Sequence, residues 1–254
     1  MNGLPPVLSP AFYVAASPPG AHRRARADWW VLLHPPYTMW HLAYVAIGAC
    51  VAPRLDASVL AATLLAFLLA VGICAHALDE LHGRPLRTRI PSWQLVAAAT
   101  TALCGAVVLG IIGLTRVGPG LAVFIAVGVV LTCGYNLELL GGRLHNDTTF
   151  AAAWGAFPVL TAYYAQAHTL RTPALLVAAA CFLLSNAQRA LSTPARRLRR
   201  RVTAIHGEVI FEDGHHEPLT ATTLLAPLEA ALRATAFGVA TLAIGLVVFR
   251  LRTG

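Results

Sequence analysis

The sequence predicts an all-α integral membrane protein, a polytopic bundle of about seven transmembrane helices. Of its 254 residues, 57% are hydrophobic and only 12% are charged, and the mean hydropathy is +0.65. A soluble globular domain carries roughly twice this charged fraction. The apolar stretches recur along the whole chain instead of forming one block, which excludes a soluble enzyme with a single membrane anchor.

Seven apolar segments are candidate membrane spans. A helix needs about 20 apolar residues to cross the hydrocarbon core, so the shorter segments would have to tilt. The segments are residues 37–50, 57–82, 94–114, 120–140, 148–164, 173–189 and 223–248.

The arginines indicate the orientation of these spans. The net charge is +8 and the chain contains no lysine. Cytoplasmic loops of membrane proteins are enriched in basic residues. We therefore expect the N terminus inside and the C terminus outside, in a prokaryotic cell membrane, with no cleavable signal peptide before the first span. Only these arginines then lie outside: Arg54, Arg116, Arg171, Arg250 and Arg252.

The predicted organisation has four parts. They are a cytoplasmic tail (1–28), a transmembrane core (29–190), a basic and polar cytoplasmic insert (191–222), and a C-terminal helix with its tail (223–254). Within the insert, GEVIFEDGHHEPL predicts a β-hairpin. The arginine-rich start of the insert could instead be an amphipathic helix on anionic headgroups. No stacking aromatic residues accompany these arginines, so we expect no nucleic-acid partner.

The second segment ends in AHALDELHGRPLRTRIP, residues 75–91. At about 100° per residue, His76, Asp79 and Glu80 share one helix face, with Gly83 opening space beneath them. Carboxylates at membrane depth normally face a wet cavity or the bundle interior, and they suit Mg²⁺. Arginines just beyond them can bind phosphate groups. The segment therefore predicts a site for a diphosphate and Mg²⁺, unless the acidic pair merely binds Arg84 or Arg87 and ends the helix.

Four stretches in this order resemble the UbiA superfamily of intramembrane prenyltransferases. DELHGRPLRTRIP is similar to the family's first aspartate motif and the loop that follows it, with Asp79 as the second aspartate. LLHPPYTMWHLAYVAIGA resembles the opening helix, and GYNLELLGG and NDTTFAAAWGAFPVLTAYYAQ resemble the fourth and fifth helices. The resemblance covers residues 28–200. It implies Mg²⁺-assisted ionisation of a polyprenyl diphosphate within the bilayer, followed by transfer to an acceptor or by cyclisation.

The chain departs from the family pattern at both aspartate motifs. Ala75 and His76 stand where the family has Asn-Asp, and Gly83 replaces the third aspartate. The second motif appears as NAQRALSTP, in which Ala190 and Pro194 replace the carboxylates. One carboxylate cluster of two therefore remains, and about seven spans stand against the family's nine.

The resemblance implies a role for each matching side chain. Asp79 would bind Mg²⁺, helped by Glu80 and His76. Arginines near the cytoplasmic mouth would hold the diphosphate, and two further residues would orient it. The arginines are Arg84, Arg87, Arg89 and Arg189, and the orienting residues are Tyr135 and Asn186.

Two rival functions stay open. The chain could be a non-catalytic isoprenoid-binding or scaffold protein of the membrane. It could also be a metalloenzyme acting on lipid, because His76, Asp79, Glu80 and His82 include the usual ligands of iron and zinc.

Other polar and aromatic residues also allow two interpretations. Asn146 or Asp147 is either a helix N-cap or a substrate contact. Glu138 is either a further acidic ligand or a partner of Arg143. The aromatic residues Trp154, Tyr163 and Tyr164 either line a prenyl tunnel or serve packing.

Overall fold

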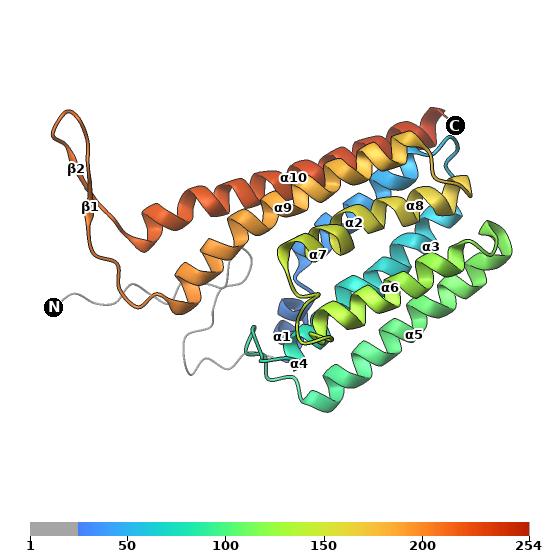
Figure 1. Cartoon of the computed structure of the whole chain (residues 1–254), viewed down its shortest axis with the longest axis horizontal. Helices are drawn as coiled ribbons and strands as arrows, with labels where there is room; N and C mark the ends of the chain where they lie inside the picture. Colours follow the sequence, from blue (N-terminus) through green and yellow to red (C-terminus); the bar gives the residue numbers. More distant parts are fainter. Residues whose placement is uncertain (1–24, 254) are drawn as a thin grey trace. The chain divides into compact units, whose positions relative to one another are not determined.

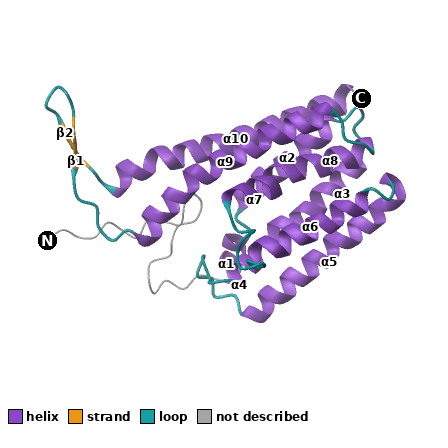
Figure 2. Cartoon of the chain, viewed as in Figure 1, coloured by secondary structure: helices purple, strands orange, loops and turns teal. Residues whose placement is uncertain are grey.

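The computed structural model describes residues 25–253. Residues 1–24, which hold most of the expected cytoplasmic tail, lie outside the described residues, as does Gly254. Almost every described element is a helix, and one short β-hairpin is present (Figure 2). The all-α class is therefore confirmed.

The described chain forms two compact units. The core unit comprises residues 25–186 and 236–253, and the insert unit comprises residues 187–235. The insert unit thus holds the 191–222 insert together with the adjoining turns of two long helices, α9 (Thr172–Arg201) and α10 (Ala221–Thr253).

The core unit is built from continuous helical segments, or rods, some of which comprise several consecutive labelled helices. These rods cover the predicted apolar segments (Figure 1). Among residues 25–253, four helical stretches are long and apolar enough to cross a membrane, namely 57–81, 92–117, 172–201 and 221–253. The elements are α1 (Ala25–Leu32), α2 (Pro35–Val51), α3 (Ala57–Phe67), η1 (Leu68–Ala75), α4 (His76–Leu81), α5 (Ser92–Val117), α6 (Leu121–Asn136), α7 (Asp147–Ala151), η2 (Ala152–Ala156) and α8 (Phe157–Ala167), followed by parts of α9 and α10.

Local chemistry explains several helix ends. Asp56 caps α3 by accepting hydrogen bonds from the backbone N–H groups of Ser58 and Val59, at 2.8 and 3.1 Å. The Ser58 hydroxyl, followed by these N–H groups, lowers the pKa of the Asp56 carboxyl. Asn146 accepts a hydrogen bond from the N–H of Thr149 at 2.8 Å, which confirms the predicted N-cap of α7.

The prediction for the fourth segment was too long at its C-terminal end. The segment was expected to reach Leu140, but α6 ends at Asn136. Glu138 and Leu140 have positive φ values of 49° and 59°, and two glycines follow them. Residues in this conformation cannot continue a right-handed helix, so the chain turns here in spite of its apolar composition.

In the described part of the chain, two rods contain π-helical turns. They are η1, which joins α3 to α4, and η2, which joins α7 to α8. A π-helical turn disturbs the regular 100° advance of side chains, and such turns often occur at functional sites. Two histidines of the predicted spans, His41 and His76, form hydrogen bonds with carbonyl groups of these turns.

Small residues allow close packing of α2 against α8, which lie side by side in Figure 1. A Cβ atom added to Gly48 would lie 2.7 Å from the Cα atom of Val159, and closer still to its carbonyl oxygen. Glycine at such contacts is typical of helix pairs in membranes.

We expect Gly48→Ala to destabilise the protein by about 1–3 kcal/mol, because the added methyl group meets backbone that cannot move aside. The matched control is Gly238→Ala, since a Cβ atom there meets nothing within 4 Å. Thermal unfolding in detergent would compare the two. Equal midpoints for both variants would show that the α2–α8 contact does not limit stability.

The insert unit carries the β-hairpin predicted from sequence. Strand β1 (Glu208–Ile210) pairs antiparallel with β2 (His216–Pro218), with Val209 opposite Glu217. The arginine-rich start of the insert continues α9 to Arg201. An ion pair between Arg199 and Glu229 joins α9 to α10 within this unit.

Candidate functional site

The two carboxylates at the end of α4 have different surroundings. Asp79 is half-buried and interacts electrostatically with His76, one turn earlier on the same rod. Glu80 is fully buried, with an exposed fraction of 0%. The predicted grouping of all three side chains on one face therefore holds most closely for His76 and Asp79.

Glu80 accepts hydrogen bonds from the loop that follows α4. Its Oε2 accepts from the N–H of Leu86 at 2.9 Å, and its Oε1 accepts from the N–H and the hydroxyl of Thr88 at 2.8 and 2.9 Å. A carboxylate with both oxygens bonded to neutral donors is a stable buried anion. This one folds residues 84–90 back against the end of α4.

Gly83 is not on the helix face where the sequence pattern placed it. The helix ends at Leu81, and Gly83 has a φ of 85°. Arg84 follows with a φ of 52°. Gly83 therefore turns the chain out of the helix, and a Cβ atom added to it would meet nothing within 4 Å.

Two further side chains hold the same loop. The Arg84 guanidinium donates to the carbonyl oxygen of Ile90 at 2.6 Å and to the hydroxyl of Ser92 at 2.7 Å. On the other side, Asp28 of α1 accepts a hydrogen bond from the backbone N–H of Arg89 at 3.1 Å. Arg84 therefore closes the loop upon itself, whereas it was predicted to bind diphosphate.

The loop exposes two arginines. Burial alternates along residues 86–90, so that Leu86, Thr88 and Ile90 are buried while Arg87 and Arg89 are exposed. The buried side chains and the Glu80 and Asp28 bonds fix the backbone that carries both guanidinium groups. Two arginines on a fixed loop are suited to binding a phosphate-containing ligand.

Histidine rings lie behind the acidic pair. The ring centroids of His34 and His76 are 5.3 Å apart. Nδ1 of His76 is 3.1 Å from the carbonyl oxygen of Gly72 in η1, and Nδ1 of His41 is 2.9 Å from that of Trp154 in η2. Each hydrogen bond, with Nδ1 as donor, leaves Nε2 as the acceptor nitrogen of a neutral ring.

A cluster of aromatic rings and a carboxylate surrounds the end of α6. Tyr135 is buried, and its ring stacks on that of His145 with centroids 4.5 Å apart. Glu138 lies 3.5 Å from Nε2 of His82 and 3.9 Å from Nδ1 of His145. Its contacts therefore join the α6–α7 loop to the end of α4. From the sequence, Arg143 was one expected partner of Glu138.

The last two predicted site residues lie on α9. Asn186 is the final residue of the core unit's part of this helix, and Arg189 follows one turn later in the insert unit. Both are half-buried.

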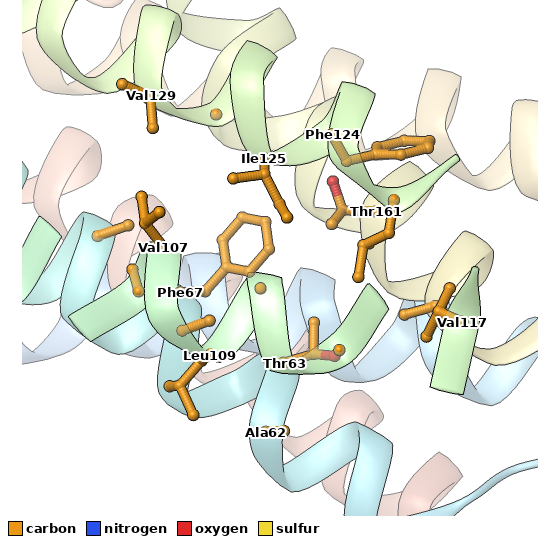
Figure 3. Close-up of a pocket in the computed structure, with 18 of the residues that line it drawn as sticks. Ala62, Thr63, Phe67, Val107, Leu109, Val117, Phe124, Ile125, Val129 and Thr161 are labelled. Carbon is orange, nitrogen blue, oxygen red and sulfur yellow. The ribbon is translucent and has the colours of Figure 1, made fainter. Parts of the chain in front are cut away.

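An apolar slot runs through the core unit between α3, α5, α6 and α8. Its volume is about 250 Å³. Figure 3 shows the ring of Phe67 between α5 and α6, close to Ile125. Along α5 the lining residues run from Leu103 to Val117, which corresponds to about 20 Å.

The two ends of the slot differ. One end is lined by Val71, Thr132 and Trp154, and the ring of Trp154 lies 6.0 Å from that of Tyr135. The other end is lined by Ser58 and Arg116, whose side chains are hydrogen-bonded at 3.0 Å. Trp154 lines the slot, whereas Tyr163 and Tyr164 are not among its lining residues.

Two residues of this site, Asp28 and Thr88, were not predicted from the sequence. Asp28 is an acidic residue followed by two tryptophans at the start of the first apolar region, and it is only 3% exposed. An isolated acidic residue next to apolar residues is a signal for a buried partner. Nothing in the local sequence distinguishes Thr88 from other loop threonines.

A metal site made from protein ligands alone is not found in residues 25–253. No three His, Cys, Asp or Glu side chains among them are grouped so that they could hold a metal ion. Mg²⁺ commonly uses only one or two carboxylates and takes its other ligands from phosphate groups and water. Asp79 is compatible with this second arrangement.

Comparison of the chain with models of known protein families, with curated proteins and with solved structures finds no match.

Proposed function

We propose that this protein is a membrane-embedded, UbiA-like prenyltransferase that acts on a polyprenyl diphosphate. We also propose that all seven predicted apolar segments cross the bilayer. The observation that carries the proposal is the combination of a charged mouth with an apolar slot in one unit. Asp79, Arg87 and Arg89 lie at or just beyond the end of α4, and Val71 of the same rod lines the slot. Such an arrangement fits an amphiphile with an anionic head and a long hydrocarbon tail.

Each proposed group has a defined task. Arg87 and Arg89 bind the diphosphate and stabilise the negative charge that develops when it leaves. Tyr135 and Asn186 orient it. Mg²⁺ bound by Asp79 and by diphosphate oxygens would supply additional charge neutralisation. The ring of Trp154 lines the end of the slot that Val71 also lines, where its face can stabilise a prenyl cation.

The direct test uses purified protein in lipid nanodiscs with labelled prenyl diphosphates and Mg²⁺. We expect release of pyrophosphate and a transferred or cyclised prenyl product. Binding of geranylgeranyl diphosphate without release of pyrophosphate in any divalent metal would exclude the enzymatic function.

That result would support the second candidate, a non-catalytic isoprenoid-binding protein. One observation favours it: Ala190 and Pro194 stand where the resemblance expects carboxylates, and both oxygens of Glu80 are bonded to the loop. The metalloenzyme interpretation has less support, because His82 contacts Glu138 at the surface.

A further inference from the structure

We infer that Glu80 is a positioning residue, which holds the backbone of residues 84–90 so that Arg87 and Arg89 can bind one anionic ligand together. This inference rests on the proposed function for the identity of the ligand, a prenyl diphosphate. The loop geometry on which it stands does not depend on that identity.

Glu80 uses most of its hydrogen-bonding capacity on the loop. A carboxylate has about four lone-pair sites. Three of them accept hydrogen bonds from Leu86 and Thr88, all between 2.8 and 2.9 Å. To bind a metal ion, Glu80 would have to give up loop contacts, and the buried N–H groups would then lose their partners.

The backbone of the loop adopts an unfavourable conformation. Arg84 and Arg87 both have a φ of 52°, a left-handed conformation that residues other than glycine adopt at a cost in free energy. A segment holds such conformations only where other contacts impose them. The contacts here come from Glu80 and Asp28 and from the Arg84 guanidinium.

Both exposed arginines lie on the side of the loop opposite Glu80. Because Thr88 points inward to Glu80, its two neighbours in the chain, Arg87 and Arg89, are turned outward. Loss of the Glu80 bonds would free this backbone, and the two guanidinium groups would have to be ordered again each time a ligand binds. Ordering a flexible loop on binding lowers affinity.

The test compares Glu80→Gln with the exposed control Glu217→Gln. In Glu80→Gln an amide NH₂ group faces a backbone N–H, so at least one loop hydrogen bond is lost. We expect faster hydrogen exchange of residues 84–90 and about tenfold weaker binding of inorganic pyrophosphate and of geranylgeranyl diphosphate. The Mg²⁺ concentration for half-maximal binding should stay unchanged. Thr88→Val, which removes one donor only, should show a smaller change in the same direction. It replaces Glu80→Gln as the test variant if Glu80→Gln does not fold.

Three results would overturn the inference. They are unchanged exchange of the loop, unchanged pyrophosphate affinity despite faster exchange, or a shifted Mg²⁺ dependence with normal loop exchange, which would make Glu80 a metal ligand. Failure of the proposed function gives a different pattern: the wild-type protein would bind pyrophosphate in a Glu80-dependent way but would not bind prenyl diphosphates. Binding of neither ligand would exclude both.

Discussion

Replacing Asp79 by asparagine should reduce Mg²⁺-dependent release of pyrophosphate from geranylgeranyl diphosphate by at least about 100-fold, the effect expected for loss of one charge at a reacting centre. The substitution keeps the size of the side chain and removes its negative charge. Asp79 is half-buried beside His76 at the end of α4, whereas its neighbour Glu80 is committed to the loop. A Mg²⁺ ion that arrives with a diphosphate would therefore depend chiefly on Asp79.

The matched control is Asp213→Asn, in the hairpin turn of the insert unit, where the carboxylate accepts a hydrogen bond from the N–H of His215. Thermal unfolding would verify that both variants are folded. If Asp79→Asn retained activity within a few-fold of Asp213→Asn, Asp79 would not belong to the site. If instead it lost affinity for the diphosphate in the absence of Mg²⁺, its role would be to hold the arginines.

The sequence was sufficient for the features that depend on local patterns. Apolar segments of suitable length became helical rods, Asn146 became an N-cap, and GEVIFEDGHHEPL became a hairpin. Each depends on residues within a few positions of one another. The preference for burying apolar side chains and satisfying backbone groups determines these features directly.

The details of the site depend on contacts between distant residues. A helical wheel places Glu80 beside His76 and Asp79, but it does not show that Leu86 and Thr88 return to fill the space next to Glu80. The bond between Asp28 and Arg89 joins residues 61 positions apart. The wheel also continued the helix through Gly83, although α4 ends at Leu81. Backbone conformation after the helix, not side-chain periodicity, decided where these groups lie.

The apolar slot should limit the length of the prenyl chain. A fully extended chain advances about 3.5 Å for every three bonds, so a slot of about 20 Å accommodates roughly four isoprene units. We therefore expect geranylgeranyl diphosphate to be a better substrate than farnesyl or geranyl diphosphate. Each additional buried CH₂ group contributes about 0.8 kcal/mol, so affinity should increase with chain length until the slot is full.

Two phenylalanine substitutions test this depth, at Thr63 and at Ala70, which both line the slot and are separated by about 10 Å along the rod. Ala70 lies at the end of the slot that Val71 and Trp154 line, so Ala70→Phe should abolish turnover of every prenyl diphosphate. Thr63 lies about two isoprene units deeper. Thr63→Phe should therefore leave turnover of geranyl diphosphate unchanged and reduce turnover of geranylgeranyl diphosphate by about 100-fold. Ala179→Phe, on the exposed face of α9, is the control for added bulk.

Because Thr63 and Ala70 lie on one rod, general damage to the rod would affect turnover of all chain lengths equally. A loss that is graded with depth, measured as pyrophosphate release from each donor, requires the tail to lie in this slot. Equal activity of Ala70→Phe and Ala179→Phe would mean that the tail lies elsewhere.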